Sequence, residues 1–225
     1  TIQPPTSSVR KLCFTLRRAS GQLLVVGDRK GPQDYSVNGA ELFTLDRQLS
    51  LPLQLPQLLP VNHYTRKNIG YLVAIGRGAQ CIYETDDDNA PLAGWQLRNR
   101  MVQARKIKGQ RWCNIYRHFT DDLIWPRGLP LDCIATAGKK LPLSGRASLV
   151  FSPIQQGLAD GSPDVDAVWR LVLDKPFQFK RGTSLALMSG MWCPFNSQST
   201  WWWPEAYPLM YLPSFCTFRT TDIWR

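Results

Sequence analysis

The sequence lacks the cysteine spacing of a structural zinc site. None of its six cysteines is separated from another by two residues, whereas structural zinc sites are commonly built from such close pairs. An even number of cysteines permits disulfides in an oxidising compartment, but Cys81 lies in an apolar run that is typical of a buried thiol. No Asn-x-Ser/Thr glycosylation site is present. The cysteines and this absence therefore do not decide the cellular compartment of the protein.

Long apolar runs are also missing. No stretch approaches the roughly 20 apolar residues that a transmembrane helix needs. The chain begins without Met or a signal peptide, and it stops after 222–225 without a closing element. We therefore expect a mature portion or a fragment of a longer protein that is truncated at its C-terminus, and any membrane anchor would lie outside it.

Charged residues make up only 20% of the chain and hydrophobic residues 44%, which excludes a disordered protein and allows a substantial core. The net charge of +10 suits a partner that carries phosphate. The densest basic run is 98–111, and such a run is most often a face or loop exposed to solvent. Because no RNA-binding motif with interleaved aromatics accompanies it, nucleic-acid binding is a minor hypothesis.

The first part of the chain predicts alternating strands and helices. Residues 1–20 are basic with two adjacent prolines and indicate a tail. The runs 22–26 and 40–45 predict strands, and the Leu, Pro and Gln of 49–60 indicate an extended connection without a helix. An apolar stripe with Gly78 as a C-terminal cap predicts a helix over 64–79.

A short strand, 81–83, follows this helix and leads directly into three aspartates. Strand, helix, strand and acidic loop are the alternation of an α/β sheet. Ligands of such sheets bind beyond the carboxyl ends of the strands, so Asp28 and the aspartates of 86–88 should lie on one edge. We predict a single folded domain over 21–225.

The pattern is weaker after residue 90. It predicts a strand at 148–151, a turn with a short helix or strand at 163–173, a strand at 185–192 and an aromatic segment at 200–211.

Asp86 and Asp88 are the strongest candidates for metal ligands. Carboxylates two positions apart on an extended loop face the same side, and Mg²⁺ and Mn²⁺ prefer oxygen ligands and share their shell with substrate phosphates. A solvated acidic turn is the alternative. His63 and His118 are candidates to complete the site, although each is more commonly structural.

Six blocks of the sequence resemble the STELLO family of glycosyltransferase-like proteins and keep the family's order. The blocks are 25–32, 64–71, 82–89, 161–167, 194–200 and 218–225. The layout is more distantly similar to the reversibly glycosylated polypeptides, which act as UDP-arabinopyranose mutases.

This resemblance implies an α/β, GT-A-like (Rossmann-related) mixed sheet flanked by helices, a UDP-sugar type of donor, and Mn²⁺ or Mg²⁺ at a DxD-type motif. Asp86 and Asp88 match the aspartates of that motif. Donor binding is expected to involve Asp28, Arg66, Lys67, Asp86 and Asp87. For Arg66 and Lys67 the alternative is an ordinary surface helix start.

The resemblance also implies an acceptor side. Asp164 and Asp166 correspond to a second acidic motif and are candidates to orient the acceptor or to act as a base, the alternative being a turn or capping role. Asn196, Gln198 and Trp201 are candidates to bind sugar, while loop closure and core packing are their alternatives.

Two functional hypotheses follow from the resemblance. The first is a metal-dependent glycosyltransferase that acts on a glycan or protein acceptor. The second is a catalytically inactive member that scaffolds or regulates a protein complex, because family members vary the acidic motif and continue past the point where this chain ends. The resemblance further suggests the Golgi lumen or secretory pathway.

Overall fold

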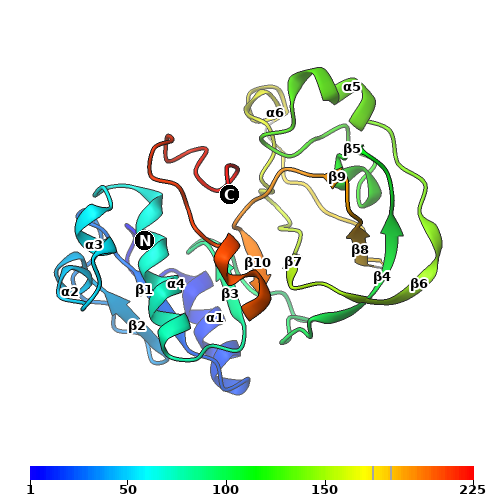
Figure 1. Cartoon of the computed structure of the whole chain (residues 1–225). Helices are drawn as coiled ribbons and strands as arrows, with labels where there is room; N and C mark the ends of the chain where they lie inside the picture. The colour runs from blue at the N-terminus through cyan, green and yellow to red at the C-terminus, as the bar shows by residue number, and fades with distance from the viewer. Residues whose placement is uncertain (174, 183) are drawn as a thin grey trace.

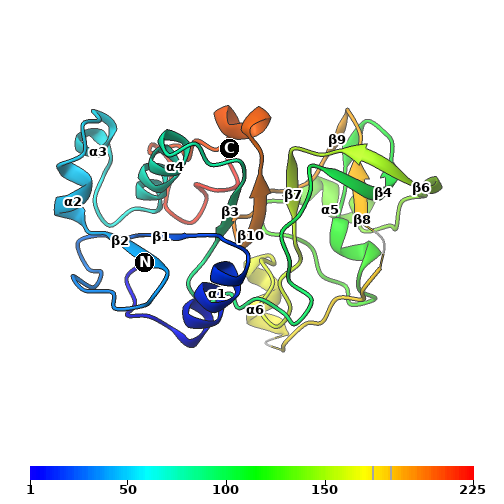
Figure 2. The same cartoon turned by 90° about the horizontal axis from the view of Figure 1, so that it is seen from below.

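The computed structural model describes residues 1–173, 175–182 and 184–225. The fold is mixed α/β, as the sequence predicts, with its strands divided among several small sheets. Figures 1 and 2 show three neighbouring groups: the β1–β2 sheet with its helices, a central sheet of β3, β10 and β7, and a second half around β4, β6 and β8. Within the described residues, no helix is long and apolar enough to cross a membrane.

Helix α1 (Ser7–Arg18) occupies the stretch expected to be a tail, so that expectation is wrong. The Thr6 side chain caps the helix by accepting a hydrogen bond from the backbone N–H of Val9. Its apolar residues recur at helical spacing and are buried at Val9, Leu12, Cys13 and Leu16. The many basic residues between them face outward and conceal this stripe in the composition.

Strands β1 (Leu23–Val26) and β2 (Ala40–Phe43) pair in parallel, and both were predicted. Helix α1 covers one face of this pair and α4 covers the other (Figure 2). Helices α2 (Leu45–Leu49) and α3 (Leu55–Leu58) follow. A helix within 49–60 was not expected, but proline is tolerated in the first turn, where Pro56 lies.

The predicted helix over 64–79 is confirmed as the short 3-10 helix η1 (Tyr64–Arg66) and helix α4 (Lys67–Gly76). Gly78 adopts φ +77° just beyond the helix end, a conformation that favours glycine. Gly70 lets the helix approach β1 closely, because a Cβ there would lie 2.7 Å from the side chain of Val26.

Strand β3 (Ile82–Thr85) follows α4, as predicted, but it joins a different sheet from β1. It pairs antiparallel with β10 (Ser199–Trp202), which also pairs with β7 (Ile154–Gln156). The expectation of one sheet edge for both acidic positions is therefore wrong. Strand pairing over more than a hundred residues decided this, and local patterning does not encode it.

The second half contains β4 (Met101–Ile107) between β6 (Ser144–Phe151) and β8 (Ser184–Leu187). A further parallel pair is formed by β5 (Arg111–Trp112) and β9 (Met191–Trp192). The single strand predicted over 185–192 is thus two strands, separated by a turn in which Gly190 has φ +87°. The remaining elements are η2 (Ile115–His118), η3 (Leu131–Cys133), α5 (Ile134–Ala137) and α6 (Ala167–Val172).

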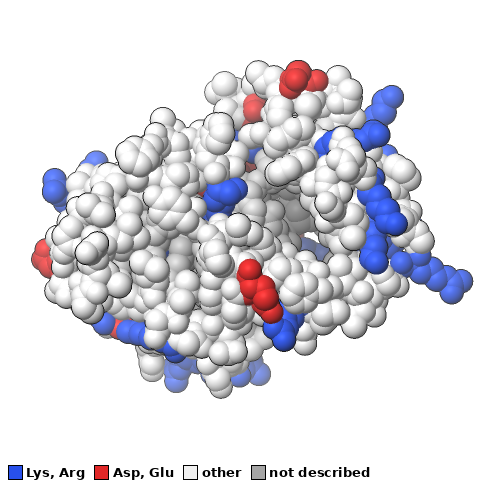
Figure 3. Space-filling model, viewed as in Figure 1, with Lys and Arg blue, Asp and Glu red and all other residues white. Residues whose placement is uncertain are grey.

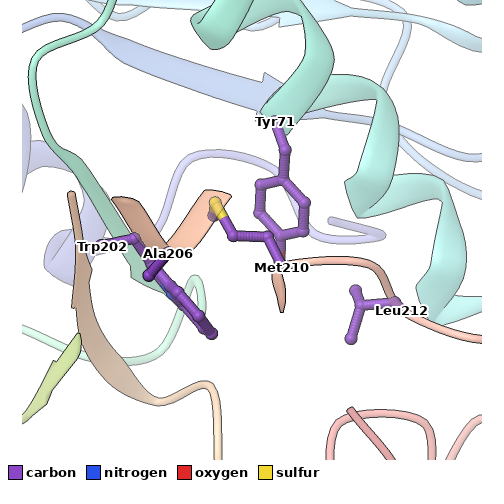
Figure 4. Close-up of a cluster of buried hydrophobic side chains, with 5 residues drawn as sticks. All are labelled: Tyr71, Trp202, Ala206, Met210 and Leu212. Carbon is purple, nitrogen blue, oxygen red and sulfur yellow. The ribbon is translucent and has the colours of Figure 1, made fainter. Parts of the chain in front are cut away.

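A buried cluster joins the central sheet to α4 and to the C-terminal segment. It consists of Tyr71, Trp202, Ala206, Met210 and Leu212 (Figure 4). Ala206 belongs to the 3-10 helix η4 (Pro204–Leu209). The segment after η4 thereby closes the core beside α4.

We predict that Leu212→Ala lowers the free energy of unfolding by about 2–5 kcal/mol, the usual cost of a large-to-small change in a core. Leu212 is fully buried, whereas Leu209 is 60% exposed. The matched change Leu209→Ala should therefore alter stability by no more than about 0.5 kcal/mol. Urea unfolding of the two variants checks this, and equal losses would contradict the assigned burial.

Candidate functional site

The acidic loop, residues 86–89, leaves the carboxyl end of β3 and is held from two sides. The Thr85 hydroxyl and the Asn89 amide both donate to the backbone oxygen of Gln198, at 2.8 and 3.1 Å. From the other side, the hydroxyls of Thr6 and Ser8 donate to the backbone oxygens of Asp87 and Asp88. The start of α1 and the β9–β10 connection thus fix the loop between them.

Asp86 is paired inside the protein. Its Oδ1 accepts hydrogen bonds from the Tyr64 hydroxyl at 2.7 Å and from the Lys67 ammonium at 3.0 Å. Burial disfavours the charged carboxylate, but Lys67 and Tyr64 outweigh it and lower the pKa of Asp86. Burial likewise opposes the charge on Lys67, while Asp86, Tyr64 and Glu84 raise the pKa of that ammonium well above its usual range.

Asp88 is the exposed member of the motif. Its pKa is raised by partial burial and by repulsion from the neighbouring carboxylates of Asp86 and Asp87. The Thr1 hydroxyl donates to the Asp87 carboxylate. Asp88 therefore presents the carboxylate of this loop that is most open to a ligand, and a cation bound there would relieve the repulsion.

A chain of hydrogen-bonding side chains leads from Asp86 to the second acidic motif. The Tyr64 hydroxyl lies 2.5 Å from the Ser197 hydroxyl, and the Ser197 oxygen lies 3.4 Å from Asp222. Because Tyr64 donates its one proton to Asp86, Ser197 donates its one proton either to Tyr64 or to Asp222. Arg127 then joins Asp222, at 3.1 Å, to Asp164. The Arg127–Asp164 pair is bidentate, with distances of 2.7 and 2.8 Å.

Asp164 and Asp166 take different roles. Burial raises the pKa of Asp164, and the charge of Arg127 opposes this shift. Asp166 instead caps helix α6 by accepting from the backbone N–H of Val168 at 3.0 Å. The capping alternative thus describes Asp166, and among these two residues Asp164 alone belongs to the hydrogen-bond chain.

Gln198 and Asn196 order the loop that connects the two motifs. The Gln198 side chain accepts from the backbone N–H of Asp164 at 2.9 Å and donates to the Ser162 oxygen at 3.1 Å. Asn196 accepts from the backbone N–H of Gln198 through its side chain. Both amides therefore have internal partners, which supports their loop-closing role in this structure.

Asp28 and Arg66 support the loop before α4. Both carboxylate oxygens of Asp28 accept backbone N–H bonds, from Asn62 at 2.8 Å and from His63 at 3.0 Å. Arg66 is only 2% exposed and donates to the Gln48 side chain and to the backbone oxygens of Pro56 and Leu59. Its guanidinium is buried and bonded to these interior groups, which corrects its expected contact with a diphosphate.

Trp201 is part of the core and does not offer a sugar-stacking surface. It is 3% exposed, and its ring packs on Tyr83 at 4.5 Å and on Trp95 at 5.3 Å between centroids. The expectation of an acceptor contact for Trp201 is therefore wrong. Period-two alternation could not reveal this, because Trp202 and Trp203 are buried as well.

Sequence reasoning also missed several groups around the loop. Tyr64, Ser197 and Asp222 lie within the matching blocks and Arg127 lies outside them, and only the fold joins the four. A cavity of about 710 Å³ opens between α1 and the segment 91–97, directly after the acidic loop. Arg10, Lys11 and Arg18 line it beside Phe14 and Trp95. The apolar residues at helical spacing in α1 are the sequence signal that could have revealed this cavity wall.

Few side chains of the acidic loop are free to hold a divalent cation. The described residues contain no cluster of three or more His, Cys, Asp or Glu side chains arranged to hold a metal. The two histidines that were candidates to complete the metal site have other surroundings. The His63 ring contacts Thr65 and the Cys216 oxygen, and His118 lies in the second half of the molecule. Asp88 and the second oxygen of Asp86 remain, and Mg²⁺ commonly takes one or two carboxylates together with phosphate and water.

The chain is similar to two proteins of Arabidopsis thaliana. It is 30% identical to "Probable glycosyltransferase STELLO2" over 227 residues, which cover 91% of this chain and 29% of the relative. It is 28% identical to "Probable glycosyltransferase STELLO1" over 252 residues, covering 98% and 31%. The chain thus spans less than a third of the length of these curated relatives. No protein-family model matches it.

We predict that Asp86→Asn weakens the pH dependence of stability in acid. Because the folded pKa of Asp86 is lowered, its ion pair contributes fully above the unfolded Asp pKa of about 3.9, and this contribution is lost as pH falls through the lower folded pKa. The variant should be less stable near neutral pH and lose less stability on acidification.

Urea unfolding from about pH 6 to about pH 3 measures this effect across the acid range of carboxylates. Asp34→Asn is the control, since Asp34 is exposed and forms no ion pair among the described residues. A wild-type acid slope in Asp86→Asn would show that the pair with Lys67 contributes nothing.

Proposed function

Since this chain belongs to the STELLO-type family of glycosyltransferase-like proteins, we propose that it binds a nucleotide-diphosphate sugar of the UDP-sugar type in a metal-dependent manner. In this proposal the sugar passes to a glycan or protein acceptor, and the acidic loop after β3 is the donor site.

The observation that carries the proposal is the linkage of the two acidic motifs. Asp86 and Asp164, far apart in the sequence, lie at the two ends of one chain of hydrogen-bonding side chains, Tyr64, Ser197, Asp222 and Arg127. A transferase needs a donor side and an acceptor side that meet. Holding the reacting groups at a fixed distance and orientation contributes much of the rate of group transfer.

The donor would lie along the acidic loop and the adjoining cavity. Asp88 and the second oxygen of Asp86 would hold Mn²⁺ or Mg²⁺, which when bound neutralises charge on the diphosphate leaving group. Arg10 and Lys11 line the cavity one turn after Ser8, whose hydroxyl contacts the loop. They replace Arg66 as the cations that meet phosphate oxygens. Asp87 remains a proposed donor contact.

Lys67 has a positioning role in this proposal. Its ammonium lies between Asp86, at 3.0 Å, and Glu84, at 3.4 Å, so it fixes the orientation of the Asp86 carboxylate. Asp28 supports the start of η1 and α4, because it holds the backbone of the loop that leads to Tyr64. Asp164 would face the acceptor, oriented by Arg127 and by the Gln198 side chain.

A specific observation favours the second candidate, an inactive member that scaffolds a protein complex. The carboxylates of Asp86 and Asp164 are already paired with Lys67 and Arg127, and a purely structural network would have the same appearance. Metal-dependent binding of UDP separates the two functions, since a scaffold has no need of it.

We predict that UDP binds the wild-type chain with Mn²⁺ present and that EDTA abolishes the binding, as measured by isothermal titration calorimetry. Asp88→Asn should weaken the metal-dependent part at least tenfold, about 1.4 kcal/mol, because it removes the exposed charged ligand. Asp34→Asn, the exposed carboxylate outside the site, should bind UDP as the wild type does.

Three outcomes matter. Loss of binding in Asp88→Asn alone supports the donor site and justifies a screen of UDP-sugars for transfer. Equal UDP binding with Mn²⁺ and with EDTA contradicts the proposed metal dependence. No binding by a folded wild-type chain would overturn the transferase proposal and leave the scaffold as the better explanation.

A further inference from the structure

A second, smaller cavity lies in the other half of the molecule. Its volume is about 150 Å³, and it is lined by Arg105, His118, Lys140, Lys180 and Arg181 together with apolar side chains. Figure 3 shows that Lys and Arg side chains gather on the part of this face that carries β4, β6 and α5. No residue of the acidic loop lines the cavity.

His118 is the feature of this cavity that calls for a ligand. Both ring nitrogens are buried, and neither has a hydrogen-bond partner among the described residues. A buried polar group without a partner costs free energy, so such groups are rarely left unmatched in folded proteins. Burial lowers the pKa of His118 below its ordinary value of 6.5, and the positive charge of Lys140 lowers it further.

The cations around His118 are only partly neutralised. Lys180 pairs with Asp121, and Arg181 pairs with Asp160 at 2.6 Å. In the part of the chain that the structure describes, Arg105 and Lys140 have no carboxylate partner. Arg105 donates a hydrogen bond through Nε to the backbone oxygen of Gly145 at 3.2 Å. The cavity therefore has an excess of positive charge at its wall and an unmatched imidazole inside.

We propose that this cavity binds a tetrahedral oxyanion, phosphate or sulfate, between His118, Lys140 and Arg105. The imidazole and both cations are donors that suit such an oxyanion. The cavity volume of about 150 Å³ leaves room for one oxyanion.

Binding should take up a proton. Without a ligand, the lowered pKa keeps His118 neutral near pH 7. An oxyanion favours the imidazolium and raises this pKa, so affinity must increase as pH falls. The charged groups around the cavity are Arg105, Lys140, Lys180 and Arg181, with Asp121 and Asp160 as the partners of Lys180 and Arg181. Because imidazole is the side chain whose charge ordinarily changes between pH 5 and 8, His118 is the group expected to take up the proton.

The test uses the chain's two histidines. Because only His63 and His118 are present, the two imidazole Hε1 resonances report separately on the two halves of the molecule. Titration with sodium sulfate at constant ionic strength should shift the His118 resonance and raise its pKa. The His63 resonance, whose ring contacts Thr65 and Cys216, should stay unchanged. Sulfate affinity should rise from about pH 7.5 to about pH 5.5.

Two neighbouring lysines provide a matched pair of variants. Lys140 lines the cavity and Lys139 does not, and both are exposed. Lys140→Ala should weaken sulfate binding about tenfold, a loss of about 1.4 kcal/mol, whereas Lys139→Ala should leave it unchanged. His118→Asn should remove the proton uptake, which is measured calorimetrically in buffers of different ionisation enthalpy.

The oxyanion could be a free ion or a group on a sulfated or phosphorylated sugar. Inorganic sulfate and phosphate form one arm of the titration, and a sulfated oligosaccharide forms the other. Tighter binding of the oligosaccharide with the same loss in Lys140→Ala assigns the source to a glycan. Equal weakening by Lys139→Ala and Lys140→Ala, or no movement of the His118 resonance, would overturn the proposal. Neither result bears on UDP binding at the acidic loop.

Discussion

The buried carboxylate of Glu84 is the constraint on which the rest of the structure depends. Glu84 is 3% exposed and accepts hydrogen bonds from Tyr71 on α4, from the Trp202 indole at 3.1 Å and from Arg225 at 2.8 Å. A buried carboxylate is stable only with such partners, and removal of one partner from a buried ion pair is strongly destabilising. This one side chain therefore fixes α4, the central sheet and the end of the chain relative to one another.

The candidate site inherits its geometry from this arrangement. Lys67 lies 3.4 Å from Glu84 and 3.0 Å from Asp86, so the buried charge and the acidic loop share one ammonium. The C-terminal segment that carries Arg225 also carries Asp222, which joins Ser197 to Arg127. The same contacts that close the core thus bring Asp164 toward the acidic loop.

The two halves of the molecule carry different chemistry. Acidic residues near the central sheet are paired or partly buried, and a single aspartate, Asp88, is exposed within the motif. The other half bears the cationic cavity around His118, where positive charge exceeds negative charge. A net charge of +10 therefore does not describe an evenly basic surface.

The sequence by itself determined the local features: the strand that comes just before Asp28, the helix that begins at Tyr64, and the strand that leads into Asp86. These follow from apolar periodicity and end signals, which act between near neighbours. It also indicated the resemblance to the STELLO family, through blocks kept in order. Only the tertiary structure decided that α1 is a buried helix, that Arg66 and Trp201 belong to the interior, and that Asp164 but not Asp166 joins Asp86. Burial and ion pairing depend on partners distant in the chain. The residue type of a charged side chain does not identify the partner with which it pairs.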